Sequence, residues 1–174
     1  MVNYFEFYNI EERFHPDAAA VKSKYYELSR KYHPDRYTLA DAGEQAEMLR
    51  LSSINNDAYK SLKDEYSTMK YLLLAKGVIE EEEKYNLPPD FLMEMMDLNE
   101  VVSELEMEPE NQELKQRAQQ LVDEQMKQWD EETLPLTKAY DEGDKSQELL
   151  SQIKDRYYRK KYLLRISDRM NNIN

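Results

Sequence analysis

The stretch VKSKYYELSRKYHPD, residues 21–35, combines an amphipathic helix pattern with a tripeptide that must end the helix. The apolar stripe, spaced i, i+4, i+7 and i+11, comprises Val21, Tyr25, Leu28 and Tyr32. This period predicts a helix over residues 18–32. Pro34 cannot continue that helix and biases the residue before it away from helical angles. We therefore expect His33 and Asp35 to be presented at the tip of a loop.

The face of this predicted helix opposite the apolar stripe is basic. Its members, with one further cation beside the loop, are Lys22, Tyr26, Arg30 and Lys31. Such a pattern is most often a solvated helix face, but here it leads directly to a loop that carries an imidazole and a carboxylate. Because the whole chain has a net charge of −12, this local positive patch is a candidate binding surface.

Two more helical patterns complete a first unit. We expect helices over residues 41–63 and 66–76, the second of them stopped by Gly77. The inward positions of the first are Met48, Leu51, Ile54, Ala58 and Leu62. An earlier tripeptide, His15-Pro16-Asp17, precedes its helix and is explained by helix entry and capping. These patterns predict a compact helical domain at residues 1–76.

A change of composition follows this domain. The acidic run Glu80 to Glu83 and the sequence Leu87-Pro88-Pro89 favour a linker at residues 77–89, because like charges repel and proline is rigid. Three further helical stretches are expected at residues 90–107, 110–140 and 145–170, punctuated by Pro109 and Gly143. With short connections, they predict an antiparallel three-helix bundle at residues 90–174.

Composition supports an all-α protein and excludes several kinds of site. The 174 residues include only 3 glycines and 6 prolines, too few for the turns of an all-β fold. There are no cysteines and 2 histidines, which excludes thiolate sites and leaves little scope for a metal site, so none is expected. The acidic balance disfavours nucleic acid as a partner, and no stretch is long and apolar enough for a membrane span or signal peptide. We expect a soluble, cytoplasmic protein.

The first domain resembles the J-domain of DnaJ-type co-chaperones. The resemblance lies in Tyr32-His33-Pro34-Asp35 and in the helix that carries Asn55, Ala58, Tyr59 and Leu62. It implies a helical hairpin with accessory helices that docks on an ATP-dependent chaperone of the DnaK/HscA type and stimulates its ATPase. The basic helix would steer the encounter and the tripeptide would trigger hydrolysis. The chain itself would then be neither an enzyme nor the binder of a cofactor.

The second domain carries a helix with two apolar faces. One stripe is the expected bundle core and comprises Phe91, Met95, Leu98, Val102 and Leu105. The opposite face holds Leu92, Met93 and Met96, edged by three carboxylates, Asp97, Glu100 and Glu104. A patch of flexible apolar side chains with an acidic rim is typical of a partner-binding surface. The alternative is that this wide stripe packs against the first domain, and periodicity does not decide between them.

The run Phe91-Leu92-Met93-Glu94-Met95-Met96-Asp97-Leu98-x-Glu100 resembles the C-terminal domain of the HscB family. The resemblance implies that the second patch binds the iron–sulfur scaffold IscU and brings it to HscA. It also implies an aromatic contact from the last helix, for which Tyr158 and Tyr162 are favoured over Tyr157. The many basic residues of that helix have no assigned function and are expected to pair with the acidic middle helix of the bundle.

Three other hypotheses compete with this one. The chain could be a J-domain protein whose bundle binds a different client. It could use His33 and Asp35 as an acid–base pair, although no second catalytic constellation accompanies them. A purely structural helical module is the third, and it leaves the solvent-facing tripeptide unexplained.

Overall fold

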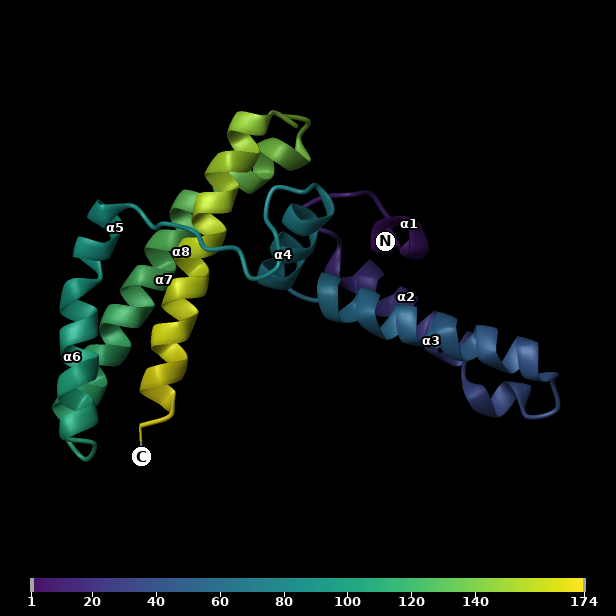
Figure 1. Cartoon of the computed structure of the whole chain (residues 1–174), viewed down its shortest axis with the longest axis horizontal. Coiled ribbons are helices and arrows are strands. Elements are labelled where there is room, and N and C mark those ends of the chain that lie inside the picture. The colour runs from purple at the N-terminus through teal and green to yellow at the C-terminus, as the bar shows by residue number, and fades with distance from the viewer. Residues whose placement is uncertain (1, 174) are drawn as a thin grey trace. The chain divides into compact units, whose positions relative to one another are not determined.

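The computed structural model describes residues 2–173, and within them every regular element is a helix, which confirms the expected all-α class (Figure 1). The chain divides into two compact units. One holds residues up to Val78 together with 140–143, and the other holds residues 79–139 and those from Asp144 onward. Among the described residues, no helix has the length and apolar character that crossing a membrane would require.

The first unit is built around a helical hairpin. Its elements are α1 (Tyr4–Tyr8), α2 (Ala18–Lys31), the 3-10 turn η1 (Pro34–Tyr37), α3 (Ala42–Leu62) and α4 (Glu65–Ala75). Helices α2 and α3 run side by side, with η1 at the end where they join (Figure 1). Asp17 is the N-cap of α2, and its side chain accepts hydrogen bonds from the backbone N–H groups of Ala19 and Ala20. This confirms the capping role expected for the first tripeptide.

The core of the first unit lies at the base of the hairpin. Its buried side chains include Phe5, Tyr8, Val21, Leu28, Ala58, Leu62, Met69, Leu72 and Leu73. Met48, Leu51 and Ile54, which were also expected to face inward, are only half-buried. The reason is geometric, since two helices that extend beyond the core can cover only one side of each other. Gly77 ends α4 with a φ of 66°, as its position in the sequence predicted.

The second unit is a helical bundle of α5 (Pro89–Glu94), α6 (Met96–Met107), α7 (Gln112–Asp141) and α8 (Gln147–Asn171). The helix expected over residues 90–107 is interrupted at Met95, where φ is −82° and ψ is −5°. The interruption does not move the apolar stripe, because all five predicted core positions of α5 and α6 are buried. From the other two helices, the core receives Ala118, Val122, Trp129, Ile153, Tyr157 and Leu163.

Residues 79–88 have no helix, yet they pack firmly on α8. The ring of Tyr85 stacks on that of Tyr158 with a centroid distance of 4.4 Å. The Tyr85 hydroxyl donates to Asp155, and the Nζ of Lys154 donates to Glu83 at 2.5 Å. This packing differs from the linker expected at residues 77–89. Glu83, the last residue of the acidic run, is bound by Lys154 and Tyr158 of α8, which local sequence does not reveal. We call residues 79–88 the covering segment.

Candidate functional site

The His33-Pro34-Asp35 tripeptide begins the 3-10 turn at the end of the hairpin. His33 is the N-cap of this turn, and its Nδ1 accepts a hydrogen bond of 3.3 Å from the Asp35 backbone N–H. Because Nδ1 is the acceptor, the neutral imidazole carries its proton on Nε2. The Asp35 side chain is 87% exposed and its nearest basic group is His33 Nδ1, 3.7 Å away. The structure thus presents one exposed donor and one exposed carboxylate, as predicted.

Side chains that sequence reasoning missed hold this loop to both helices. Arg36 Nη1 donates to the carbonyl oxygen of Arg30 at 3.3 Å, and the Tyr37 hydroxyl donates to that of Lys31 at 2.8 Å. Both acceptors belong to the last turn of α2, whose carbonyls have no partner within the helix. From α3, Gln45 Nε2 donates to the carbonyl oxygen of Tyr37 at 3.0 Å. The sequence signal that could have indicated these anchors is the pair of side chains with donor groups, Arg36 and Tyr37, a few residues after the end of α2.

The basic face of α2 lies on the solvent side of the hairpin. Lys22, Tyr26, Arg30 and Lys31 are all exposed. Lys24 pairs with Glu27 at 3.1 Å, whereas Lys22 and Arg30 have no ion-pair partner among residues 2–173. Their charges are therefore available to a partner. Such exposed charges act mainly on the rate of encounter and fade as salt is added.

A buried polar residue sets how α2 packs on α3. Asn55 Nδ2 donates to the carbonyl oxygen of Tyr25 at 3.1 Å and to Ser29 Oγ at 3.0 Å. Its own Oδ1 accepts from the Tyr8 hydroxyl at 3.0 Å. The rings of Tyr25 and Tyr59 stack beside it with a centroid distance of 4.2 Å. Because this network fixes the rotation of α2, it keeps the apolar stripe inside and the basic face outside.

The second candidate surface lies on α5 and the start of α6. Leu92, Met93 and Met96 are exposed, the last two by 69% and 64%. The three rim carboxylates, Asp97, Glu100 and Glu104, are exposed as well. Within the second unit these side chains are therefore not part of the bundle core. We call the three apolar residues the apolar patch and the three carboxylates the acidic rim.

The two tyrosines favoured on the last helix have different surroundings. Tyr162 is half-buried, its oxygen accepts from Asn99 Nδ2 at 2.9 Å, and its ring meets Phe91 edge-on at 5.7 Å. Tyr162 thus contacts Phe91, which precedes Leu92 in the chain. Tyr158 is only 7% exposed and does not lie on the free surface that was expected. The covering segment lies over it, and its hydroxyl donates to Glu83 at 2.9 Å.

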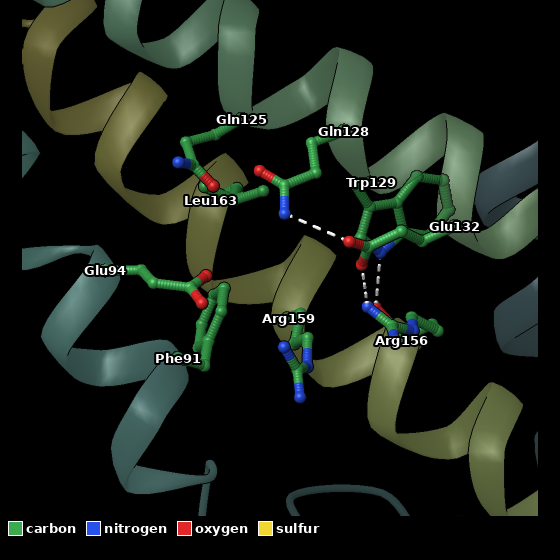
Figure 2. Close-up of a pocket in the computed structure, with 9 residues that line it drawn as sticks. All are labelled: Phe91, Glu94, Gln125, Gln128, Trp129, Glu132, Arg156, Arg159 and Leu163. Carbon is green, nitrogen blue, oxygen red and sulfur yellow. Dashed lines mark hydrogen bonds and ion pairs between the residues drawn. The ribbon is translucent and has the colours of Figure 1, made fainter.

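A small cavity behind the apolar patch is lined by residues of α5, α7 and α8 (Figure 2). Its volume is about 20 Å³, close to that of one water, so it is too small for a ligand. Arg159 lies over the Phe91 ring at 4.9 Å, and Trp129 Nε1 donates to the carbonyl oxygen of Arg156 at 2.7 Å. Glu132 pairs with Arg156 across it (Figure 2). The Arg159 contact joins α8 to α5, which carries Leu92 and Met93, and the other two contacts join α7 to α8.

Several cations of the last helix are paired, as expected. Arg156 and Lys160 pair with Glu132 and Asp130 of α7. Two other cations of α8 pair with residues outside α7. Lys154 pairs with Glu83 of the covering segment, and Arg169 pairs with Glu106 of α6. The hydrogen bond from Lys154 lowers the pKa of Glu83, and burial raises the pKa of Tyr158. Within residues 2–173, no group of three His, Asp or Glu side chains is placed to hold a metal ion.

A helical hairpin with an anchored His-Pro-Asp loop, followed by a helical bundle with an exposed apolar patch, is the architecture of a J-domain protein with a second helical unit. Comparison with known proteins gives a particular family. The family model described as "HSCB C-terminal oligomerisation domain" matches residues 87–171. The "Co-chaperone protein HscB homolog" of Neisseria meningitidis serogroup B is 32% identical over 128 residues, which are 73% of this chain and 77% of that relative. The chain belongs to the HscB co-chaperone family.

Solved structures agree on the fold. The crystal structure of the human co-chaperone protein HscB matches with a TM-score of 0.80 at 24% identity, covering 98% of this chain and 81% of that one. Chaperone HscB from Vibrio cholerae matches with a TM-score of 0.75 at 22% identity, covering 99% and 97%. A second relative by sequence, the "Co-chaperone protein HscB homolog" of Colwellia psychrerythraea, is 32% identical over 105 residues, which are 60% of each chain. The fold implied by the two resemblances is thereby confirmed.

Proposed function

We propose that this chain stimulates ATP hydrolysis by a DnaK/HscA-type chaperone and delivers an IscU-type iron–sulfur scaffold to it. The observation that carries the proposal is the exposed His33 and Asp35 pair on an anchored loop, directly beyond the basic face of α2. Membership of the HscB family supports both halves of the proposal, and the apolar patch supports the second.

The loop acts by contact, and the hydrolysis chemistry belongs to the chaperone. The Asp35 carboxylate accepts charge-assisted hydrogen bonds from cationic groups of the chaperone, while His33 Nε2–H offers a donor. Pro34 and the hydrogen bonds of Arg36 and Tyr37 hold both groups in place before binding. Less conformational entropy is then lost on docking, so more of the contact energy is available to shift the chaperone toward its hydrolysing state.

The apolar patch and acidic rim supply the client contact. Leu92, Met93 and Met96 can adapt their side chains to an apolar surface of the scaffold. In such surfaces a few central residues dominate, and truncating one of them typically costs about 2 kcal/mol of binding free energy or more. The rim carboxylates Asp97, Glu100 and Glu104 favour a client with a basic border and repel acidic proteins. One chain would therefore hold the client and the chaperone at two different units.

Single-turnover ATP hydrolysis by the chaperone tests this proposal. The rate is measured with the chaperone alone, with this protein added, and with this protein and the scaffold added together. We expect stimulation by this protein and further stimulation when the scaffold is present. Stimulation that is indifferent to the scaffold would reassign the client, and an unchanged rate with any chaperone of the DnaK/HscA type would reject the proposal.

A further inference from the structure

A groove of about 310 Å³ lies in the second unit where the covering segment crosses α8. Three cations line it, Lys84 from the covering segment and Lys161 and Arg165 from α8. Three tyrosines, Tyr85, Tyr158 and Tyr162, complete most of its lining. We call this site the cationic groove. It contrasts with the chain as a whole, whose net charge is −12.

The positive charge of the groove is not balanced within it. Glu83 is the one carboxylate among its described lining residues, and it is already neutralised by Lys154 at 2.5 Å and hydrogen-bonded by Tyr158 at 2.9 Å. Neither Lys161 nor Arg165 has an ion-pair partner among residues 2–173, and the same is true of Lys84. The Lys161 ammonium lies 5.8 Å from the centre of the Tyr158 ring. This cation–π contact does not neutralise the positive charge of Lys161. The groove therefore favours an anion.

The arrangement suits the carboxylates of a peptide. Lys161 and Arg165 are one turn apart on the same face of α8, and Lys84 belongs to the other wall, so successive acidic side chains could each meet a cation. The tyrosine rings of the groove can pack against the aliphatic parts of these acidic side chains. A phosphate group would favour a helix N-terminus, but α8 begins at Gln147, about four turns before Lys161. The volume is at the small end for organic ligands.

Tyr162 connects the lining of the groove with α5 and α6, which carry the proposed client surface. The same tyrosine that lines the groove contacts Phe91 and accepts a hydrogen bond from Asn99, next to the apolar patch and acidic rim. We propose that the cationic groove binds an acidic segment of the protein client whose apolar surface covers Leu92, Met93 and Met96. This inference rests on the proposed function and deepens it, because it assigns the client two patches of opposite charge.

The test compares two double variants of the full chain by isothermal titration calorimetry. Lys161→Gln with Arg165→Gln removes two cations from the groove and keeps the side-chain stems. Lys115→Gln with Arg117→Gln on α7 removes the same charge far from it in sequence and serves as the control. Each is titrated with an IscU-type scaffold and with a short polyglutamate peptide. We expect the groove variant to bind the scaffold about tenfold more weakly and to lose the peptide, and the control to match the wild type.

The outcomes separate this inference from the proposed function. A groove variant that binds the scaffold as tightly as the wild type overturns the inference and leaves the proposed function standing. A wild-type protein that binds polyglutamate but not the scaffold overturns the proposed function, and with it the identity of the occupant.

Equal weakening of scaffold binding in both variants means that net charge alone acts. A wild-type dimer that dissociates only in the groove variant means that a second copy of the chain occupies the groove. Either result overturns the inference. Circular dichroism and the melting temperature check that both variants fold.

Discussion

The hydroxyl of Tyr37 donates a hydrogen bond of 2.8 Å to the carbonyl oxygen of Lys31, and this bond ties the His-Pro-Asp loop to the last turn of α2. The bond satisfies a carbonyl that the helix leaves without a partner. It also makes Tyr37, which lies beside the tripeptide, a determinant of how rigidly His33 and Asp35 are presented. A loop that is held before docking loses less entropy on docking.

Tyr37→Phe should therefore weaken stimulation of the chaperone without unfolding the first unit. The variant keeps the ring and loses one hydrogen bond, worth about 1 kcal/mol, which corresponds to about a fivefold loss of stimulation at a limiting concentration. Single-turnover hydrolysis measures the loss, and circular dichroism checks the fold. Full stimulation by this variant would show that the anchor does not matter.

Asp35→Asn should abolish stimulation, because the amide lacks the charge that strengthens hydrogen bonds to cationic groups of the chaperone. The chain supplies its own matched control in the first tripeptide. Asp17→Asn makes the same chemical change, and asparagine caps a helix as well as aspartate does, so both stability and stimulation should be retained. Similar losses in both variants would indicate an effect of net charge and would contradict the role given to Asp35.

Local periodicity was enough to predict much of this architecture. The stripe through Phe91, Leu98 and Leu105 and the exposed face opposite it are repeats within one stretch of chain, so the sequence carries them directly. The same holds for α2 and for the stop at Gly77. The short helix α1 was missed because five residues are too few to show a period, and it forms because Phe5 and Tyr8 are buried.

Contacts between distant residues account for what local pattern could not predict. Tyr158 was expected on an exposed face, but Tyr85 and Glu83, more than seventy positions earlier, cover it. The position of Gln45, which holds the loop from the far helix, depends likewise on how α2 meets α3. A helical wheel shows which face of a helix is free of its own apolar stripe, and it carries no information about which other segment crosses that face.

Replacing Leu92, Met93 and Met96 together by alanine should weaken scaffold binding by tenfold or more while the melting temperature changes little. These side chains are exposed, so their truncation leaves no cavity. Met95→Ala is the matched control within the same turn, since that side chain is fully buried and its loss should cost about 2–5 kcal/mol of stability. A large drop in melting temperature for the triple variant would mean that the patch is part of the core.

Asn55→Ala should destabilise the first unit by about 2 kcal/mol, because the change removes the buried amide that donates to the Tyr25 carbonyl and to the Ser29 hydroxyl. The Tyr8 hydroxyl keeps the backbone carbonyl of residue 55 as its acceptor. Chemical denaturation measures this free energy of unfolding. Stimulation of the chaperone should also fall at temperatures where the variant is still folded, since α2 is less firmly held in rotation. Unchanged stability would show that water or another side chain replaces the amide.

The covering segment should detach from α8 at alkaline pH, because the Tyr85 hydroxyl must be protonated to donate to Asp155. Burial, followed by the hydrogen bond to Asp155, raises the pKa of Tyr85 to about 12. Because the folded state favours the protonated Tyr85 hydroxyl, this hydroxyl contributes its full stabilisation below the unfolded pKa of about 10. The contribution is lost as the pH rises through the pKa of the folded state, about 12. The free energy of unfolding of the second unit should therefore fall between about pH 10 and 12.

The variant Tyr85→Phe has no hydroxyl proton to lose, so its stability should lack the part of this fall that is due to Tyr85. Denaturation curves at stepped pH give the comparison, and identical slopes for the two proteins in this range would contradict the role assigned to the Tyr85 hydroxyl.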